Sequence, residues 1–182
     1  MLVVSNKKFQ QTTSETIMNG TFYWKGNPNG IMIYNGTTLY HYSSHYWQGF
    51  PQSVLYYDGN KLNIKRIKLA GDLGDVSKIK WAIGGVGLIT PYGYSPEAEG
   101  FSGAYADVLR KCNKTVLATK DNKVYMVVAK SIDHTDLVGE LRKYGFELAI
   151  SLDGGGSTFL KCNNEVIIPT DGRTLNNWIV AL

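Results

Sequence analysis

The chain has 182 residues, 43% of them hydrophobic and 19% charged, which is the composition of an ordinary globular protein. A chain of this length buries enough surface to fold without a metal ion or a set of disulfides, so we expect one domain over residues 1–182. The formal net charge of +4 is compatible with a phosphate-bearing ligand but is only weak evidence for nucleic-acid binding, and we do not expect a nucleic-acid partner. The 20 glycines and 12 tyrosines favour a β-rich domain, because glycine is common in turns and tyrosine in strands.

The N-terminal residues do not have the pattern of a signal peptide. Met1–Lys8 places apolar residues before positive ones, and no long apolar segment follows. No part of the chain approaches the roughly 18 consecutive apolar residues that a membrane-spanning helix needs. We therefore expect a soluble, cytoplasmic protein with no membrane partner. The high content of Asn, Lys and Tyr would also suit a phage-encoded protein that acts in the cytoplasm of its host.

Four segments, taken in chain order, predict β-hairpins. Each has two short apolar or aromatic runs separated by a turn of Asn, Asp or Gly residues, which is the usual hairpin pattern. The segments are residues 31–40, 54–65, 115–129 and 158–168. In the second segment and just after it, basic residues alternate with apolar ones, and we expect the basic ones to form the exposed face of an edge strand. These residues are Lys61, Lys65, Arg66 and Lys68, and a grip on a polyanion is the weaker alternative.

One α-helix is predicted between the third and fourth hairpins. Either Asp133 or Thr135 can cap its start, and Gly145 suits a left-handed residue after its end. Its apolar residues recur at helical spacing, namely Leu137, Val138, Leu141 and Tyr144.

The helix connects two predicted strands of one sheet. The run from Phe146 to Leu152 is almost continuously apolar, as in a strand covered on both faces. Residues 124–152 therefore predict a strand, a helix and a second strand parallel to the first. The fold class that follows is mixed α and β (α+β), a β-rich mixed sheet with one or two packed helices.

The apolar strand leads directly into a glycine loop, Ser151–Thr158, with the sequence Ser-Leu-Asp-Gly-Gly-Gly-Ser-Thr. Three adjacent glycines are entropically costly and are kept where side chains would obstruct something. Successive free N–H groups in such a turn suit a phosphate or another anion. The loop is not a phosphate-binding P-loop, because no lysine precedes the hydroxyl residues, and it lacks the spacing of a dinucleotide motif. A tight turn without any ligand is the alternative.

The glycine loop also resembles a known family signature. Ala149–Thr158 is similar to the "A-x-N-L-D-G-G-G-S-S" signature of the phosphodiester glycosidase family. Further segments resemble that family in the same order along the chain. They are residues 17–23, 26–30, 81–89, 133–144 and 171–177.

The resemblance covers almost the whole chain. It implies the mixed α/β fold of the family and hydrolysis of the glycosidic bond in a sugar phosphodiester. Two positions depart from the family pattern: Lys114 stands where an arginine is usual, and Ser151 replaces an asparagine. Lysine keeps the charge but loses the bidentate geometry that suits phosphate, and Arg110 could substitute for it.

The loop residues and the resemblance together assign candidate roles. Asp153 is the candidate general base or nucleophile, although it could be only a turn residue that binds the glycine amides. Arg173 is assigned with it to catalysis through phosphate binding, with a surface salt bridge as the alternative. The remaining candidates would bind phosphate or sugar, and local hydrogen bonding in turns is the alternative for the two asparagines. They are Asn19, Gly20, Lys114, Gly154, Gly155, Gly156, Ser157, Thr158 and Asn177.

Other features are assigned less specific roles. A second carboxylate could be Glu97, Glu99, Asp107 or Asp171, although a phosphate leaving group makes a second acid dispensable. The aromatic segment Tyr40–Trp47 could stack on a sugar or base, or simply pack in the sheet and core. His41, His45 and His134 show no metal-ligand spacing, so we expect no metal and no cofactor, and His134 is interpreted as a residue of the helix cap. We expect Cys112 and Cys162 to be free thiols.

Two functions remain open from the sequence. The first is a hydrolase that cleaves the glycosidic bond of a sugar phosphodiester or of a nucleotide-sugar-like molecule. The second is a non-catalytic protein that sequesters a phosphorylated small molecule. In both cases the partner is a phosphorylated sugar or a nucleotide-like compound, and the oligomeric state is not predicted.

Overall fold

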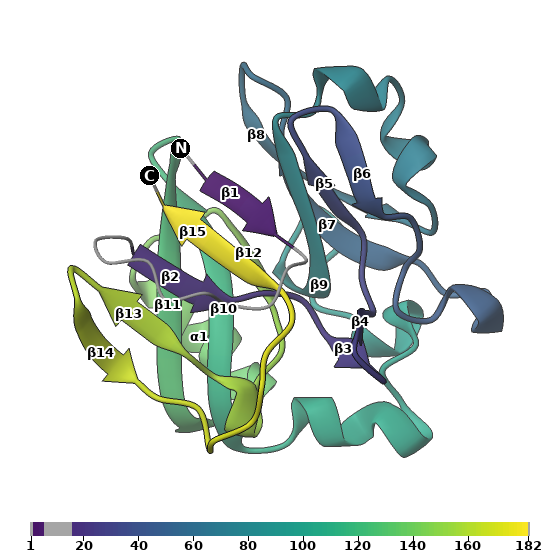
Figure 1. Ribbon diagram of the computed structural model, residues 1–182. Coiled ribbons are helices and arrows are strands. Elements are labelled where there is room, and N and C mark those ends of the chain that lie inside the picture. Colours follow the sequence, from purple (N-terminus) through teal and green to yellow (C-terminus); the bar gives the residue numbers. More distant parts are fainter. Residues whose placement is uncertain (1, 6–15, 182) are drawn as a thin grey trace.

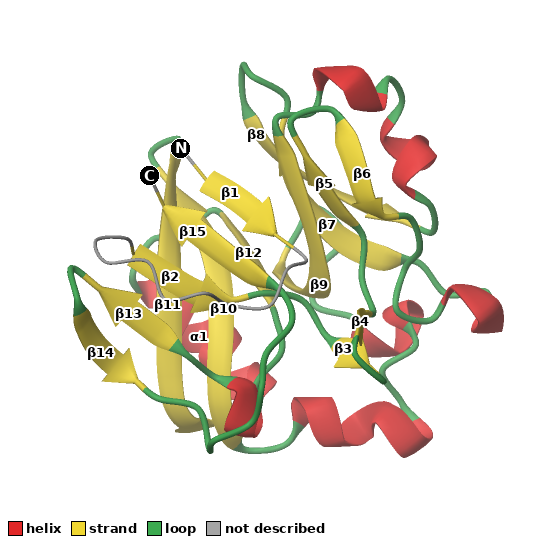
Figure 2. Ribbon diagram, in the orientation of Figure 1, coloured by secondary structure: helices red, strands yellow, loops and turns green. Residues whose placement is uncertain are grey.

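The computed structural model describes residues 2–5 and 16–181, so part of the N-terminal segment Met1–Lys8 lies outside the described residues (Figure 1). The described chain is rich in strands (Figure 2). It contains one α-helix, and its other helical segments are short 3₁₀ turns, which confirms the predicted β-rich α+β class. None of its helices has the length and apolar content to cross a membrane.

Most strands of the described chain are short, and the three longest all belong to the larger sheet. The strands are β1 (Leu2–Ser5), β2 (Thr16–Asn19), β3 (Tyr23–Trp24), β4 (Asn27–Pro28), β5 (Met32–Tyr34), β6 (Thr37–Tyr40), β7 (Gln52–Tyr57), β8 (Leu62–Ile67), β9 (Trp81–Ile89), β10 (Cys112–Lys120), β11 (Lys123–Ile132), β12 (Leu148–Ser151), β13 (Leu160–Cys162), β14 (Glu165–Ile168) and β15 (Trp178–Ala181). The helix is α1 (His134–Lys143), and the 3₁₀ segments are η1 (Tyr46–Gln48), η2 (Ala70–Leu73), η3 (Val76–Lys78), η4 (Pro96–Glu99), η5 (Gly103–Leu109) and η6 (Gly155–Ser157).

The larger sheet is organised around β9. One edge of β9 pairs with β7, and the other edge pairs first with β5 and then with β12. The sheet forks where β5 and β12 separate, at Gly84 and Gly85. A Cβ on Gly85 would lie against the carbonyl group of Ser151, and one on Gly84 would meet the side chain of Gln52. Glycine in the middle of this strand therefore permits the close approach of its neighbours.

A smaller antiparallel sheet, in the order β1-β15-β2-β13-β14, packs against the larger one (Figure 1). The core between them contains fully buried side chains from both sheets, such as Met18 and Ile179 from the smaller and Leu55, Leu117 and Ile150 from the larger. Each such aliphatic side chain contributes roughly 1.5–3 kcal/mol through burial. This packing fixes the position of β2 relative to β12, and hence of Asn19 relative to the glycine loop.

All four predicted hairpins are present, as β5–β6, β7–β8, β10–β11 and β13–β14. Three of them have two-residue turns in which both residues have positive φ: Asn35-Gly36, Asp121-Asn122 and Asn163-Asn164. Asparagine, aspartate and glycine tolerate this conformation better than other residues, so the turn sequence determines where each hairpin reverses.

The predicted helix and its crossover are also confirmed. The carboxylate of Asp133 caps α1 by accepting a hydrogen bond from the Asp136 amide, and Gly145 has a φ of 78° after the last turn. Strands β11 and β12 are both antiparallel to β10, so they are parallel to each other, with β10 between them. Leu137 and Val138 pack α1 onto this part of the sheet, opposite the smaller sheet.

The basic residues on β8 and around it behave differently from one another. As predicted, β8 is an edge strand, and Lys61, Lys65 and Lys68 are exposed. Arg66 departs from the prediction, because its guanidinium turns inward and pairs with the buried carboxylate of Glu99 at 3.1 Å. A carboxylate with no solvent contact needs a counter-charge, and Arg66 supplies it.

Candidate active site

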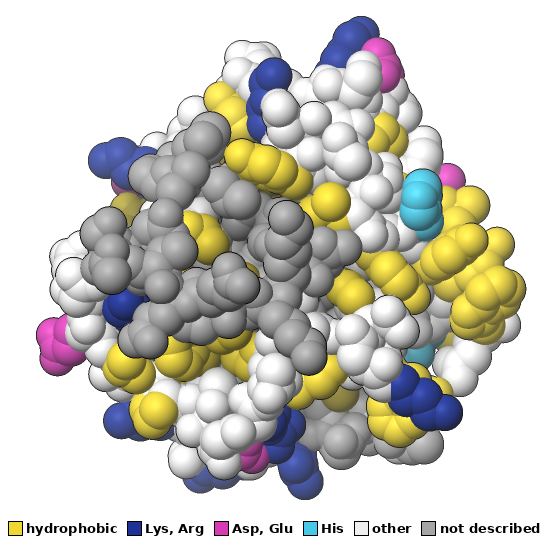
Figure 3. All heavy atoms as spheres, in the orientation of Figure 1, with side chains coloured by type: hydrophobic (Ala, Val, Ile, Leu, Met, Phe, Trp, Pro, Cys, Tyr) yellow, Lys and Arg dark blue, Asp and Glu magenta, His cyan; other side chains and the backbone are white. Residues whose placement is uncertain are grey.

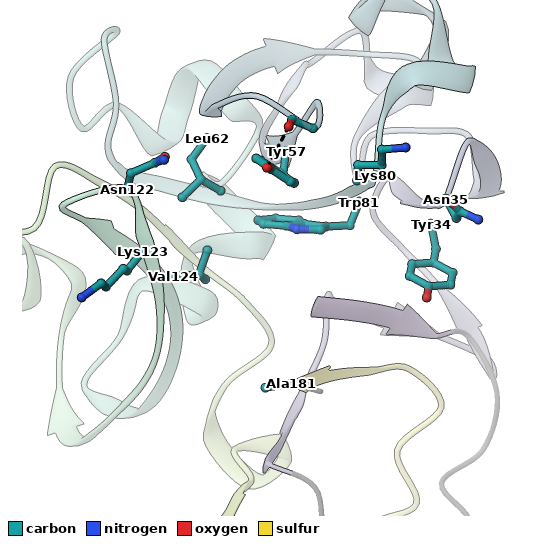
Figure 4. Close-up of a pocket in the computed structure, with 11 residues that line it drawn as sticks. Tyr34, Asn35, Tyr57, Leu62, Lys80, Trp81, Asn122, Lys123, Val124 and Ala181 are labelled. Atoms are coloured by element: carbon teal, nitrogen blue, oxygen red, sulfur yellow. Dashed lines mark hydrogen bonds between the residues drawn. The ribbon is translucent and has the colours of Figure 1, made fainter. Parts of the chain in front are cut away.

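One cavity, of about 630 Å³, is formed by residues of β5, β7, β8, β9 and β11. Figure 4 shows the ring of Trp81 at its centre, with the ammonium ends of Lys80 and Lys123 pointing away from that ring. No carboxylate or imidazole of the described residues lines it. Its titratable side chains are tyrosines and lysines, which act in acid–base catalysis less often than histidine does.

A smaller cavity, of about 180 Å³, lies where β12 ends and the glycine loop begins. Six of the eleven predicted site residues line it, namely Lys114, Asp153, Gly154, Gly155, Gly156 and Arg173. Its volume is below the 300–1,000 Å³ typical of drug-sized ligand pockets. It therefore has room for the reacting part of a substrate but not for a whole dinucleotide.

Strand pairing explains why Lys114 lies beside the glycine loop. Ser151 is opposite Val116 in the β10–β12 ladder, and the amide of Leu152 donates to the carbonyl of Thr115 at 2.8 Å. Residues just before Thr115 must therefore lie beside the residues just after Leu152. This places Cys112 and Lys114 in the cavity wall next to Asp153.

Each glycine of the loop has a different steric reason to be glycine. A Cβ on Gly154 would lie 2.8 Å from the carbonyl oxygen of Asn113, and one on Gly156 would collide with the side chains of Asp171 and Arg173. Gly155 has open space around its Cα but a φ of 60°, a conformation that L-residues rarely adopt. The first and third glycines thus permit close contacts with neighbouring residues, and the second permits a left-handed backbone conformation.

The loop presents free hydrogen-bond donors to the cavity. The amides of Gly154, Ser157 and Thr158 donate to acceptors of the loop itself. Those of Gly155 and Gly156 donate no hydrogen bond within the described residues, and both residues line the cavity. Two adjacent free amides form a concave partial positive charge suited to an anion.

Asp153 provides the titratable group of the cavity. Its carboxylate accepts hydrogen bonds from the Gly154 amide, at 3.1 Å, and from the Ser157 hydroxyl. Burial raises the pKa of Asp153 to about 6, an effect that outweighs these hydrogen bonds and the nearby charge of Arg173. A carboxyl with a pKa near neutrality is suited to proton transfer.

The cationic side chains differ in how firmly they are held. Lys114 is 1% exposed, and its ammonium donates to the carbonyl of Val108 at 2.7 Å. Burial lowers the pKa of Lys114. Arg110, from the same wall, is exposed at the cavity mouth.

Arg173 lies at the cavity edge but has most of its donors engaged. Its Nε and one terminal nitrogen donate to the two carboxylate oxygens of Asp171, at 2.8 and 2.6 Å, and the other terminal nitrogen to Ser157 at 3.3 Å. The hydrogen bond from Arg173 lowers the pKa of Asp171. The two-pronged face that we expected to hold phosphate is thus occupied by a carboxylate of the protein.

The other predicted site residues form a layer behind the cavity. The Asn19 amide nitrogen donates to the Asp153 carbonyl at 2.7 Å, and its oxygen accepts from Thr115 and Phe159. The carbonyl of Gly20 accepts from the Asp153 amide at 3.2 Å. Asn19 and Gly20 therefore hold the backbone of Asp153 from both sides.

Three further predicted residues are buried near the loop. Asn177 packs its side chain against Gly20 and donates to the Thr21 carbonyl at 3.0 Å. Ser157 and Thr158 are 0% and 1% exposed, and only Ser157 has a side-chain contact with Asp153 and Arg173. The cavity lining includes none of these three.

The predicted second carboxylates do not line the cavity within the described residues. Glu97 is exposed, and Glu99 is buried against Ser53 and Arg66. Asp171 is paired with Arg173, and the side chain of Asp107 lies outside the described residues. The described chain also contains no cluster of three or more His, Cys, Asp or Glu side chains that could hold a metal ion.

Sequence reasoning missed several residues of the cavity wall. Val108 lines it from a segment without a distinctive motif, and Phe22 from a segment noted only for its family resemblance. Ser151, noted only as a departure from the family pattern, lines it with its hydroxyl 2.9 Å from Nε2 of His134. Burial lowers the pKa of His134 to about 3. A histidine directly after a cap residue gives no sign in the sequence that it will face a strand 17 positions later.

The aromatic segment Tyr40–Trp47 does not line the small cavity. Trp47 is 86% exposed, and the ring of Tyr46 lies 4.9 Å from both Tyr42 and Trp47. Hydrophobic side chains gather at the edge of the molecule where η1 lies (Figure 3). Cys112 and Cys162 are both free.

Comparison with known proteins gives consistent results. The profile of the phosphodiester glycosidase family matches residues 2–182. The structure is similar to the zebrafish N-acetylglucosamine-1-phosphodiester alpha-N-acetylglucosaminidase catalytic domain, auto-inhibited by its pro-peptide (TM-score 0.71, 14% identity, 93% of this chain and 63% of that chain). It is also similar to a hypothetical protein from Synechocystis (TM-score 0.58, 13% identity, 98% of this chain and 56% of that chain). The chain thus spans less than two thirds of either structure, and no curated protein matches it.

Proposed function

Because the chain belongs to the phosphodiester glycosidase family, we propose that it hydrolyses the glycosidic bond of a sugar phosphodiester or of a nucleotide-sugar-like molecule. One observation carries the proposal: Asp153, with a pKa of about 6, shares a small cavity with two free amides and three basic side chains. The substrate would place its phosphate against the donors and its reacting sugar carbon near the carboxylate.

The phosphate would be held mainly by uncommitted donors. The amides of Gly155 and Gly156 are free within the described residues, and Lys114 and Arg110 line the same cavity. These groups would stabilise the negative charge that grows on the phosphate as it leaves. Arg173 would add a positive field and the donors that Asp171 and Ser157 leave free.

Asp153 would act directly on the reacting carbon or on water. As a base it would take a proton from a water molecule that attacks the anomeric carbon, while the bond between that carbon and the phosphate oxygen breaks. As a nucleophile it would bond to that carbon first, and water would then release the sugar. In both cases the products are a free sugar and a phosphate monoester.

A dedicated acid for the leaving group is not required in this reaction. A phosphate monoester is a stable anion, and Lys114 and the loop amides would neutralise its charge. This agrees with the absence of a second carboxylate from the cavity wall in the described part of the chain.

The direct test is cleavage of a panel of sugar phosphodiesters and nucleotide-linked ribosides, with products identified by mass spectrometry. We expect cleavage by the parent and a loss of roughly 10² to 10⁴ in rate for Asp153→Asn. Glu97→Gln, an exposed carboxylate outside the cavity, is the control and should match the parent. Full activity of a folded Asp153→Asn protein would refute the role of Asp153.

The second candidate function is sequestration of a phosphorylated small molecule without turnover. The ion pair of Arg173 with Asp171 favours this function, because the two nitrogens that would hold a phosphate in bidentate fashion already donate to Asp171. A compound bound by the parent, recovered unchanged, and lost in a Lys114→Gln variant would establish this function instead. A cytoplasmic location and a phage origin stay predictions from the sequence.

A further inference from the structure

Ser151 lies in the wall of the proposed active site and contacts His134 behind it, and neither residue has a role in the reaction described above. Ser151 is the last residue of β12, and His134 is the first residue of α1. Both are 1% exposed, and Nε2 of His134 lies 2.9 Å from the Ser151 hydroxyl oxygen. Ser151 also lines the small cavity with Asp153.

Strand alternation directs Ser151 toward the catalytic side of the sheet. Ala149 packs against α1, whereas Ile150 and Leu152 pack in the core on the opposite face. Ser151 therefore shares the α1 face with Ala149, because alternate residues of a strand point the same way. His134 approaches from α1, so the helix supplies the partner that holds the Ser151 hydroxyl at the cavity wall.

The surroundings of His134 indicate which atom donates the hydrogen bond between its Nε2 and the Ser151 hydroxyl. Nδ1 of His134 is buried and has no hydrogen-bond partner. A buried N–H without an acceptor is rarer, and costs more, than a buried acceptor without a donor. The proton of the neutral ring therefore belongs on Nε2, which donates to Ser151. The Ser151 proton is then left with the Leu152 carbonyl, at a long 3.4 Å, or with an acceptor in the cavity.

The same pair does not fit a catalytic serine with a histidine base. Burial and the nearby charge of Lys114 lower the pKa of His134 to about 3. An imidazole with this pKa is too weak a base to remove a serine proton near neutral pH. The pair is thus suited to donating a neutral hydrogen bond.

We propose that Ser151 is a substrate-binding residue that donates a hydrogen bond to a sugar hydroxyl, and that His134 is the residue that positions it. The proposal rests on the proposed function and names part of its substrate. A hydroxyl that accepts from Ser151 can donate its own proton to Asp153, which a phosphate oxygen cannot do. The sugar hydroxyl closest to the scissile bond is on the carbon next to the reacting carbon, and contacts to that hydroxyl assist glycoside cleavage in general.

The experiment measures binding of two matched pairs of probes by calorimetry. The pairs are ribose 1-phosphate with 2-deoxyribose 1-phosphate, and glucose 1-phosphate with 2-deoxyglucose 1-phosphate. For at least one pair we expect the parent to prefer the hydroxylated member by roughly ten-fold, since a neutral hydrogen bond is at stake. Ser151→Ala should bind both members equally and retain the affinity of the parent for the deoxy compound.

Three further variants test the role of His134. His134→Leu keeps bulk but removes the donor and should lose the preference, whereas His134→Gln keeps a donor and should restore part of it. Val138→Ala, on the same buried face of α1 and outside the cavity, should lower stability without changing the preference. If Val138→Ala loses the preference as His134→Leu does, a general loosening of α1 explains the effect and the positioning role is overturned.

The outcomes separate this inference from the proposed function. A preference that survives in Ser151→Ala overturns the binding role of Ser151, even if the parent cleaves phosphodiesters as proposed. Binding by the parent without any preference for the hydroxyl overturns it as well. Binding of none of the four probes, together with no cleavage of any phosphodiester, refutes the proposed function and the inference with it.

Discussion

At the scale of single residues, the carboxyl group of Asp153 lowers the stability of the folded protein when it is ionised. Its pKa of about 6 lies above the ordinary value of 3.8, so the folded state binds the Asp153 proton more tightly than the unfolded chain does. The contribution of this group to stability is therefore complete below pH 4 and is lost as the pH rises through 6. At neutral pH the protein carries a partly buried charge that lowers its stability.

The first prediction concerns this cost. Asp153→Asn removes the charge and keeps an oxygen that can accept from the Gly154 amide. At pH 7.5 we expect the variant to be more stable than the parent, by on the order of 2 kcal/mol. At pH 4 the difference should vanish, and thermal unfolding at both pH values measures it. Equal stability of the two proteins at pH 7.5 would show that the ionised carboxylate of Asp153 does not destabilise the fold.

The second prediction concerns the pH dependence of catalysis. If ionised Asp153 is the base or nucleophile, kcat/KM should rise with pH and level off above about 6. The profile of cleavage between pH 4.5 and 8 measures this. A rate that falls as the pH rises through 6 would instead assign Asp153 the role of a proton donor.

The third prediction concerns His134, whose pKa is shifted in the opposite direction. Its folded-state value of about 3 is below the ordinary 6.5, so its contribution to stability is complete above pH 6.5 and is lost as the pH falls. Between pH 7 and 5 the parent should lose stability relative to His134→Gln, which has no group that titrates there. Denaturant unfolding at these two pH values measures the free energy of unfolding of both proteins. If the parent and His134→Gln change equally between the two pH values, the burial of a neutral His134 is contradicted.

Single residues were predictable from the sequence only where a motif marked them. Asp153 and the three glycines stand in a distinctive run, and the structure brings them to one cavity. The contact between His134 and Ser151 depends on how α1 docks on the sheet, which no local pattern encodes. The ion pair of Arg173 with Asp171 is local, and the two-residue spacing that permits it was visible in the sequence.

At the scale of elements, the sequence was more informative. Asn and Gly pairs placed the hairpin turns because few other residues adopt positive φ, and the helix was marked by its cap and its apolar spacing. The order of strands around β10 was not predictable in the same way. The crossover from β11 to β12 skips one strand, and that depends on pairings between distant segments.

The fourth prediction concerns the glycine loop as an element. Gly154→Ala should destabilise the protein by about 1–3 kcal/mol, because the added Cβ meets the backbone of Asn113. Gly156→Ala should destabilise it less, because its Cβ meets only the exposed side chains of Asp171 and Arg173, which can move away. Gly139→Ala, in the exposed middle of α1 with open space around it, is the control. It should stabilise by about 0.5–1 kcal/mol through helix propensity. Chemical denaturation of the three variants tests the ranking, and a neutral Gly154→Ala would show that the loop can move away from β10.

At the scale of the whole molecule, one buried carboxylate connects the cavity wall to the larger sheet. Glu99 accepts hydrogen bonds from the amide and hydroxyl of Ser53 in β7 and from the amide of Gly87 in β9. Its segment continues into η5, which supplies the Val108 carbonyl that holds Lys114. The sequence alone did not identify this anchor, because its partners lie on strands distant in the chain.

The fifth prediction follows from this connection. Glu99→Ala leaves Arg66 without its buried partner and should lower the free energy of unfolding by about 3–5 kcal/mol. Glu97→Ala, an exposed carboxylate of the same 3₁₀ segment, should have almost no effect. Hydrogen exchange should show faster opening around residues 103–110 in Glu99→Ala than in Glu97→Ala. Equal exchange in the two variants would disprove the anchoring role.

The pairing of β1 with β15 has a consequence for how the protein is made. Leu2 lies opposite Ala181 in this ladder, and β15 also pairs with β2, whose Asn19 holds the backbone of Asp153. During translation, the smaller sheet therefore cannot be completed until β15 has left the ribosomal exit tunnel. Until then β2 lacks one of its two neighbouring strands, and the glycine loop lacks part of its support. The segments that meet at the small cavity can thus reach their final arrangement only after β15 has emerged from the tunnel.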